Sequence, residues 1–138
     1  MGTVRPRPDQ IQALMEKGPV GPIVMVNLLK FRAHAAYEAD KPEANENLTG
    51  RQAYERYAQE VQKHLAAVGG RIVWQGPQAL VMIGPEDQKW DVVACVRYPS
   101  REAFLKMAMS PDYNTIVYHR DAGLEDTALL CCEAGSAA

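Results

Sequence analysis

Apolar and polar positions along the chain fall into two spacings, one typical of strands and one typical of helices. Short, nearly continuous apolar stretches bounded by turn residues predict strands over residues 23–31, 71–75, 79–83, 90–98 and 127–132. Apolar residues three and four apart, bounded by capping residues and glycines, predict helices over residues 9–17, 49–68, 100–109 and 112–123. The 79–83 stretch either continues the strand before it or pairs with that strand.

After the first helix, the predicted elements follow the order strand, helix, strand, strand, helix, strand. This is the ferredoxin-like βαββαβ order of an α+β domain, in which an antiparallel sheet carries its helices on one face. The strand over residues 90–98 is apolar on both faces, because Val92, Ala94 and Val96 alternate with Val93 and Cys95. Since the domain's own helices cover only one face, we expect a second copy of the chain to cover the other and form a homodimer.

The chain has 138 residues, a length that fits a single domain spanning residues 1–138. Residues 1–19 are a helical extension before the first strand. Residues 33–49 are polar and indicate a loop insertion. Residues 133–138 are expected to be a frayed tail.

Charge and composition exclude several classes of protein. The net charge is −2 and no run of lysine and arginine forms a basic patch, so we expect no nucleic acid partner. The apolar runs are far shorter than the ~20 residues of a membrane-spanning helix, and residues 1–9 do not resemble a signal peptide, so we expect no membrane partner and a cytoplasmic location. Cys95, Cys131 and Cys132 are predicted to be reduced, since neighbours on a strand point to opposite faces.

An arginine interrupts the apolar stripe of the last predicted helix. Tyr113, Ile116, Val117 and Arg120 recur at a spacing that places them on one helical face. A buried guanidinium must reach water, pair with a carboxylate or hold an anionic ligand, because an unpaired buried charge is too costly. Arg120 therefore either anchors a carboxylate or enolate beside the Tyr113 hydroxyl, or forms a structural ion pair. The candidate carboxylates for such a pair are Asp91, Asp112, Asp121 and Glu125.

Further candidates for a polar pocket lining lie on the long helix and on the strands. His64 is on the apolar face of the helix over residues 49–68, where an imidazole suits either a general base or a packed histidine with one hydrogen bond. Asn27 interrupts the first strand and needs hydrogen-bond partners there. His119 is expected on the solvated side of its helix. A tyrosine gives a pocket wall an apolar ring and a polar hydroxyl, and the candidates for such a wall are Tyr54, Tyr57 and Tyr98. The sequence has no metal, phosphate-loop or nucleophile-elbow motif, so no cofactor or metal is predicted.

Five segments, residues 26–31, 54–57, 69–71, 98–104 and 110–113, follow one another along the chain and are followed by Arg120. Together, in this order, they resemble the DUF1330 family, a family of unknown function within the dimeric α+β barrel superfamily. The resemblance implies a homodimer whose two sheets face each other. Relatives in the superfamily include cofactor-free monooxygenases, haem-degrading enzymes, muconolactone isomerases and stress-response proteins. Some of these use an asparagine on the first strand, a tryptophan and a histidine, which Asn27, Trp74 or Trp90, and His64 or His119 match by residue type.

The sequence therefore predicts a homodimer that binds a small molecule. The candidate catalytic residues are His64, Tyr113 and Arg120, and the candidate ligand-binding residues are Asn27, Tyr54, Tyr57, Trp74 and Tyr98. As an enzyme, the protein would be a cofactor-independent monooxygenase or isomerase for an anionic or enolisable aromatic or carbonyl compound. Arg120 would hold the anionic oxygen and His64 would move the proton. The alternative is a non-catalytic structural or stress-associated homodimer, in which these residues only fix the interface.

Overall fold

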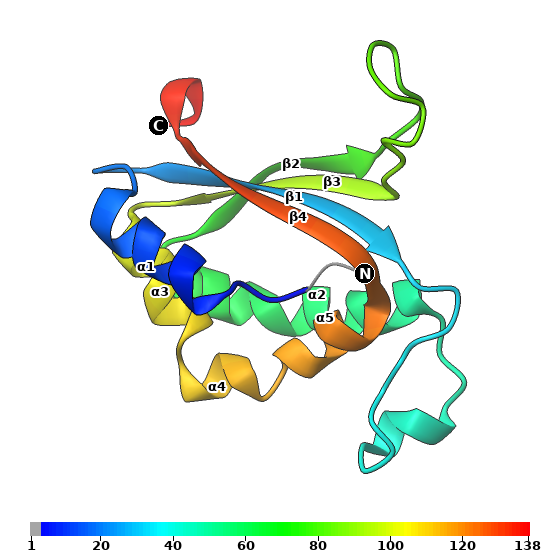
Figure 1. Cartoon of the computed structure of the whole chain (residues 1–138). Helices are drawn as coiled ribbons and strands as arrows, with labels where there is room; N and C mark the ends of the chain where they lie inside the picture. Colours follow the sequence, from blue (N-terminus) through cyan, green and yellow to red (C-terminus); the bar gives the residue numbers. More distant parts are fainter. Residues whose placement is uncertain (1–3) are drawn as a thin grey trace.

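The computed structural model describes residues 4–138 and shows a four-stranded antiparallel sheet with its helices on one face (Figure 1). The strands lie in the order β2-β3-β1-β4. They are β1 (Ile23–Phe31), β2 (Arg71–Pro77), β3 (Val92–Tyr98) and β4 (Leu124–Glu133). The helices are α1 (Pro8–Lys17), α2 (Gly50–Ala67), α3 (Arg101–Ala108), α4 (Pro111–Asn114) and α5 (Val117–Gly123), with short 3-10 helices η1 (Pro42–Asn45) and η2 (Gly135–Ala137). This confirms the predicted ferredoxin-like α+β fold.

Side-chain caps fix where the helices of this layer begin. The Thr49 hydroxyl accepts the Gln52 backbone N–H at 3.1 Å, and the Gln52 amide oxygen accepts the Thr49 backbone N–H at 2.9 Å, which completes a capping box. Ser100 caps α3 through the Ala103 backbone N–H at 3.0 Å. These caps satisfy backbone donors that have no partner inside a helix.

The core lies between α2 and the helix-facing side of the sheet. The buried residues of this cluster are Ile23, Met25, Tyr57, Val61, Leu65, Tyr98, Met107 and Ile116. The α2 members recur at helical spacing, as the sequence predicts, and the β1 members are the odd-numbered positions of that strand. Each face is thus fixed by the periodicity of its own element.

The helix predicted over residues 112–123 is divided in two. Ser110 caps α4 by accepting the Tyr113 backbone N–H at 3.0 Å. The Thr115 hydroxyl then donates to the Asp112 carbonyl at 2.6 Å, and α4 ends at Asn114. A threonine hydroxyl that bonds a preceding carbonyl competes with the backbone ladder of the helix. The chain consequently turns before Val117 starts α5, and α5 carries Arg120.

Two other segments differ from their predicted form. Residues 79–83 form no strand; they belong to a loop between β2 and β3 that rises from the sheet on the side away from the helices (Figure 1). The 133–138 tail, predicted to fray, is tied down instead. The Ala134 backbone N–H donates to the Pro22 carbonyl at 3.1 Å, and Arg97 Nε donates to the Ala137 carbonyl at 2.9 Å. These bonds hold η2 against the sheet.

Two glycines let α5 approach the start of α2 closely. A Cβ on Gly123 would lie 2.5 Å from the Gly50 carbonyl oxygen, and a Cβ on Gly50 would lie 2.2 Å from the Arg32 carbonyl oxygen. Both distances are far below van der Waals contact with backbone atoms that cannot move aside. The glycine pair therefore sets the position of α5, and with it the position of Arg120.

The sheet face away from the helices, called the open face below, is apolar except at its two ends, which carry Lys30 with Asp126 and Arg71 with Arg97. Residues opposite each other in the register share a face, so the open face carries Val24, Val26, Leu28, Trp74, Val93, Cys95, Ala128, Leu130 and Cys132. Trp74 is 55% exposed and Leu130 is 51% exposed. In residues 4–138 no α-helix lies over this face, and only the 3-10 helix η2 contacts it, at the end where Arg97 lies (Figure 1).

Candidate functional site

A cavity of about 720 Å³ lies between the helix-facing side of the sheet and the segments around it. Its walls come from residues 4–7, here called the N-terminal segment, together with α1, β1, β4 and the chain from α3 to α5. The polar groups of the lining include Asn27, Tyr57, Tyr98, Tyr113 and Arg120. The apolar part includes Leu14, Met25, Phe104, Met107, Val117 and Leu129. A mostly apolar cavity with a few converging polar groups is typical of a small-molecule site.

Arg120 is the buried cation of this cavity, with only 8% of its surface exposed. Its Nη1 donates to the Val4 carbonyl at 2.7 Å. Within residues 4–138 it forms no ion pair with a carboxylate. One of the predicted ion-pair partners is engaged elsewhere, since Glu125 pairs with Lys30 at 3.3 Å. The structure thus does not contain the predicted structural ion pair of Arg120.

Asp121, the neighbour of Arg120, holds the N-terminal segment in place. Arg5 Nε donates to Asp121 Oδ2 at 2.6 Å, and the Arg5 Nη2 atom pairs with the same oxygen. Asp121 Oδ1 is buried and has no hydrogen-bond partner within the described chain. Two adjacent residues of α5 therefore contact the N-terminal segment, one through a backbone carbonyl and one through an ion pair.

Two tyrosine hydroxyls meet at the wall of the cavity. The oxygens of Tyr57 and Tyr113 are 2.8 Å apart, and their rings pack edge to face with centroids 6.1 Å apart. Burial raises the pKa of Tyr57 well above its usual value; Tyr113 adds to the shift and the Arg120 charge opposes it. Burial also raises the pKa of Tyr98. These phenols stay protonated at neutral pH, so they are hydrogen-bond donors rather than bases.

Asn27 lies on the cavity side of β1, on the same face as Met25 and opposite to Lys30, as the strand parity predicts. Its Nδ2 donates to the Ala94 carbonyl at 3.2 Å and to the Met25 carbonyl at 3.3 Å. The amide is therefore held by the backbone, and its oxygen remains as the acceptor of the side chain.

His64 and Tyr54 lie behind the cavity wall. His64 is not among the residues that line the cavity; its ring packs edge to face on Tyr113, with centroids 6.2 Å apart. Its Nε2 atom is buried and has no hydrogen-bond partner in residues 4–138. Burial raises the pKa of Tyr54, and the nearby Arg120 charge opposes that shift. From outside the cavity, His64 thus packs on Tyr113, and Tyr54 lies next to Arg120.

Comparison with known proteins places the chain in a family. Residues 44–134 match the family model described as a domain of unknown function, DUF1330. A protein of unknown function from Rhodopseudomonas palustris, RPA0582, is 34% identical, with a TM-score of 0.85 over 96% of this chain and 97% of that chain. The chain belongs to the DUF1330 family. The methylated form of RPA0582 is similar at 35% identity, with a TM-score of 0.86 over 96% of this chain and 94% of that one.

Beyond the DUF1330 family the similarity is weak. A dimeric protein of unknown function with a ferredoxin-like fold from Bacteroides fragilis is 13% identical, with a TM-score of 0.49 over 81% of this chain and 95% of that chain. No curated protein matches the chain. Within residues 4–138, no helix has the length and the apolar content needed to cross a bilayer.

The asparagine, tryptophan and histidine that the resemblance brings together do not meet in this DUF1330 chain. Trp74 lies on the open face, on the other side of the sheet from Asn27. The cause is a β-bulge between Ile72 and Trp74, which shifts every later residue of β2 by one position relative to β3. Trp90 does not line the cavity. A ligand-binding role for Trp74 is consequently separate from the cavity.

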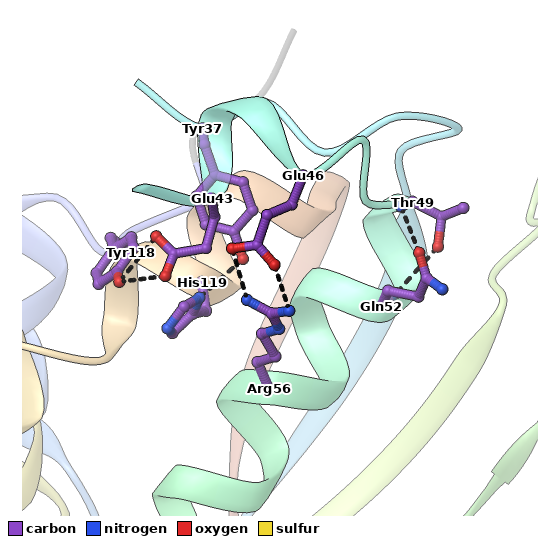
Figure 2. Close-up of polar contacts among 8 residues, drawn as sticks. All are labelled: Tyr37, Glu43, Glu46, Thr49, Gln52, Arg56, Tyr118 and His119. Atoms are coloured by element: carbon purple, nitrogen blue, oxygen red, sulfur yellow. Dashed lines mark hydrogen bonds and ion pairs between the residues drawn. The ribbon is translucent and has the colours of Figure 1, made fainter. Parts of the chain in front are cut away.

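His119 is buried rather than solvated, with 9% of its surface exposed, which corrects the expectation from the helical pattern. Its Nδ1 accepts a hydrogen bond from the Tyr37 hydroxyl at 2.7 Å if the imidazole carries its proton on Nε2 (Figure 2). Burial lowers the pKa of His119, against the opposing charge of Glu43. Burial raises the pKa of Tyr37 to about 12.

The 33–49 insertion docks on α5 through this histidine and its neighbours (Figure 2). The Tyr118 hydroxyl donates to the Glu43 carboxylate, with oxygens 3.1 and 3.2 Å apart. Arg56 Nη2 donates to Glu46 Oε1 at 2.8 Å. The insertion does not line the cavity, whereas the N-terminal segment does. Sequence periodicity gives no signal for the contacts with α5, because the insertion has no regular pattern and its partners Tyr118 and His119 lie 75 and 82 positions away.

Proposed function

We propose that this DUF1330 protein binds a small anionic molecule in the cavity, with Arg120 as the anchor of its charged oxygen. The observation that carries the proposal is a guanidinium that is 8% exposed, lines a cavity of about 720 Å³ and has no carboxylate partner in the described chain. Burying such a cation without a counter-charge costs several kcal/mol, at least ~3 kcal/mol when a buried pair is broken. A bound carboxylate or enolate would supply the missing charge in bidentate geometry.

The groups around Arg120 suit one end of an apolar or aromatic acid. The hydroxyls of Tyr57 and Tyr113 hydrogen-bond to each other at the wall, which leaves one of their two protons to donate to a second oxygen of the ligand. The methionine, leucine and phenylalanine side chains of the lining would contact its apolar body. Cys131, also in the lining, is no nucleophile in this proposal, because partial burial raises the pKa of its thiol.

The catalytic version of the proposal is a cofactor-independent monooxygenase or isomerase that acts on an aromatic or enolisable carbonyl compound. Arg120 would stabilise the anionic oxygen of the enolate. The proton must pass through His64, and the ring of Tyr113 lies next to that imidazole at a centroid distance of 6.2 Å. No histidine or carboxylate is among the lining residues. Binding is therefore better supported than base catalysis.

A second proposal, independent of the cavity, is that the chain is a homodimer through its open face. It is supported by the apolar character of that face and by the exposure of Trp74 at 55% and Leu130 at 51%. A sheet that is apolar on both faces needs a second cover. A non-catalytic structural dimer would need this face alone, without a ligand on Arg120.

A thermal-shift screen of small carboxylates on the wild type and on Arg120→Gln separates an anion-binding role of Arg120 from a purely structural one. The glutamine amide keeps a donor for the Val4 carbonyl but loses the charge. We expect carboxylates to raise the melting temperature of the wild type only, since binding to the folded state stabilises it by RT ln(1 + [L]/Kd). Equal responses of both proteins, or a large loss of stability in Arg120→Gln with no ligand effect in either, would leave only the structural reading.

A further inference from the structure

The loop between β2 and β3 exposes large apolar side chains that residues 4–138 do not cover. In this loop, residues 78–91, called the arm below, Leu80 is 63% exposed, Met82 is 84% exposed and Ile83 is 97% exposed. The arm rises on the open-face side of the sheet (Figure 1). Apolar side chains that stand next to an apolar sheet face indicate one continuous contact surface.

The base of the arm is held in a fixed shape. Gln78 Nε2 donates to the Gln88 carbonyl at 2.8 Å, and the Trp90 backbone N–H donates to Gln78 Oε1 at 3.0 Å. The Asp91 backbone N–H donates to the Leu29 carbonyl of β1 at 2.7 Å. These bonds join the two sides of the arm and tie it to the sheet. The arm is thus braced while its apolar tip remains in solvent.

We propose that the arm packs against a second copy of this chain, at the end of the partner's open face where Arg71 and Arg97 lie. The inference rests on the proposed homodimer and adds to it a contact that the open face alone does not require. Each protomer would give one arm and receive one, as a two-fold interface demands.

Charge supports this placement. Arg71 lies directly opposite Arg97 across β2 and β3, on the open face, and like charges in such a cross-strand pair repel each other. Neither arginine forms an ion pair with a carboxylate in the described chain, and Arg97 donates to the neutral Ala137 carbonyl instead. The arm carries Glu86 and Asp87, with one lysine after them. Acids delivered by a partner's arm would relieve the repulsion between the two arginines.

The topology brings these charges together across a two-fold axis. The arm connects the end of β2 to the start of β3, whereas Arg71 begins β2 and Arg97 is near the end of β3. The acidic arm and the arginine pair therefore lie at opposite ends of one protomer. When two open faces pack with their strands aligned, an axis perpendicular to the strands places each arm over the partner's arginine end.

The dimensions of the arm fit this arrangement. Packed sheets lie about 10 Å apart, and one side of the arm, residues 78–84, spans up to about 20 Å when extended. Burying an aliphatic side chain removes roughly 100 Å² of apolar surface, so the three exposed arm residues would contribute roughly 250 Å². That is about a third of the ~800 Å² that each partner buries in a stable interface. The open face supplies the remainder.

Sedimentation equilibrium over a dilution series tests the arm, with two methionine-to-lysine variants as a matched pair. Met82→Lys changes the tip of the arm, and Met15→Lys makes the same change on α1 in the helix layer, where Met15 is 55% exposed. We expect Met82→Lys to raise the dimer dissociation constant at least tenfold and Met15→Lys to change it less than twofold. Equal effects in both variants would overturn the role of the arm. Circular dichroism and melting of each variant establish that it is folded.

Charge reversal tests where the arm lies. Arg71→Glu is expected to raise the dissociation constant at least threefold, and adding Glu86→Arg and Asp87→Arg to it is expected to restore dimerisation. A triple variant no tighter than Arg71→Glu would overturn the contact between the arm and the arginines. Trp74→Glu checks the homodimer itself. If Trp74→Glu breaks the dimer and Met82→Lys leaves it intact, the proposed homodimer stands and the role of the arm is overturned. A monomeric wild type would overturn both.

Discussion

Arg120 Nη1 donates to the Val4 carbonyl at 2.7 Å, although the two residues are 116 positions apart. The N-terminal segment therefore crosses the cavity at the atom that would hold a ligand's charge. A neutral carbonyl satisfies one of the five N–H donors of a guanidinium and leaves its charge uncompensated. A bound anion would engage the remaining donors of the guanidinium next to the N-terminal segment and supply the missing charge.

The ion pair between Arg5 and Asp121 holds that segment closed. In Asp121→Asn we expect the backbone amides of the N-terminal segment to exchange hydrogen about 2–5 times faster than in the wild type, since a partly exposed ion pair contributes about 0.5–1 kcal/mol. Glu102→Gln is the control, because it removes an exposed ion pair with Arg101 away from the segment. Hydrogen exchange that is unchanged in Asp121→Asn, measured by mass spectrometry, would show that this pair does not restrain the segment.

The paired hydroxyls of Tyr57 and Tyr113 predict a coupled response to substitution. Each tyrosine-to-phenylalanine change leaves the other hydroxyl without its partner and is expected to cost about 1 kcal/mol in the free energy of unfolding. The double variant should cost less than the sum, because it leaves no unpaired hydroxyl behind. Urea unfolding of the four proteins measures the coupling. Strictly additive costs would contradict a direct hydrogen bond between them.

His119 predicts how stability depends on pH. Burial lowers its folded-state pKa below the unfolded value, so the stability gained by keeping it neutral is complete above about pH 6.5. That stability is lost as the pH falls through the folded-state pKa, because the unfolded chain takes up the proton first. One such group contributes at most about 1.4 kcal/mol per pH unit.

In His119→Asn, whose amide oxygen can still accept from Tyr37, we expect a smaller loss of unfolding free energy between pH 6.5 and pH 5 than in the wild type. Tyr37→Phe serves as the comparison, since it removes the hydrogen bond but keeps the titrating imidazole. Identical pH profiles for His119→Asn and the wild type would contradict the assignment.

The close approach of Gly123 to Gly50 predicts strong intolerance of a methyl group. Gly123→Ala would place a Cβ 2.5 Å from the Gly50 carbonyl oxygen, and we expect a cost of about 2 kcal/mol or more in unfolding free energy. Gly76→Ala is the matched control, because its nearest neighbour is the exposed Trp74 side chain at 3.1 Å, which can move. Similar costs for the two variants, by thermal unfolding, would contradict this packing.

The parts of the fold that follow from local periodicity are predictable from the sequence. The apolar stripe of α2 and the alternation along β1 place Tyr57 and Asn27 on the side where the cavity lies. The break between α4 and α5 is not visible in that pattern, because the backbone changes to i→i−3 bonds at Thr115 and Ile116 without any change in the apolar spacing. The face of Trp74 depends on a bulge, which reverses the parity of β2 without a sequence signal of its own.

Only those residues of the candidate site that share one helical pattern are predictable from the sequence. Tyr113 and Arg120 stand out because they share one stripe near the end of the chain. The Val4 contact of Arg120 and the Tyr37 contact of His119 join segments 116 and 82 positions apart, and neither Val4 nor Tyr37 lies in a periodic pattern. Such contacts are set by how the loops pack on α5, which a pattern of apolar positions does not specify.

The most direct test of the central claim is isothermal titration of the wild type and Arg120→Gln with benzoate and with benzyl alcohol. The two probes share a ring and differ in the charged oxygen that Arg120 would hold. The account predicts that benzoate binds the wild type, that benzyl alcohol binds it at least tenfold more weakly, and that Arg120→Gln removes this difference. Equal binding of both probes to the wild type, or a preference for benzoate that survives in Arg120→Gln, would contradict it.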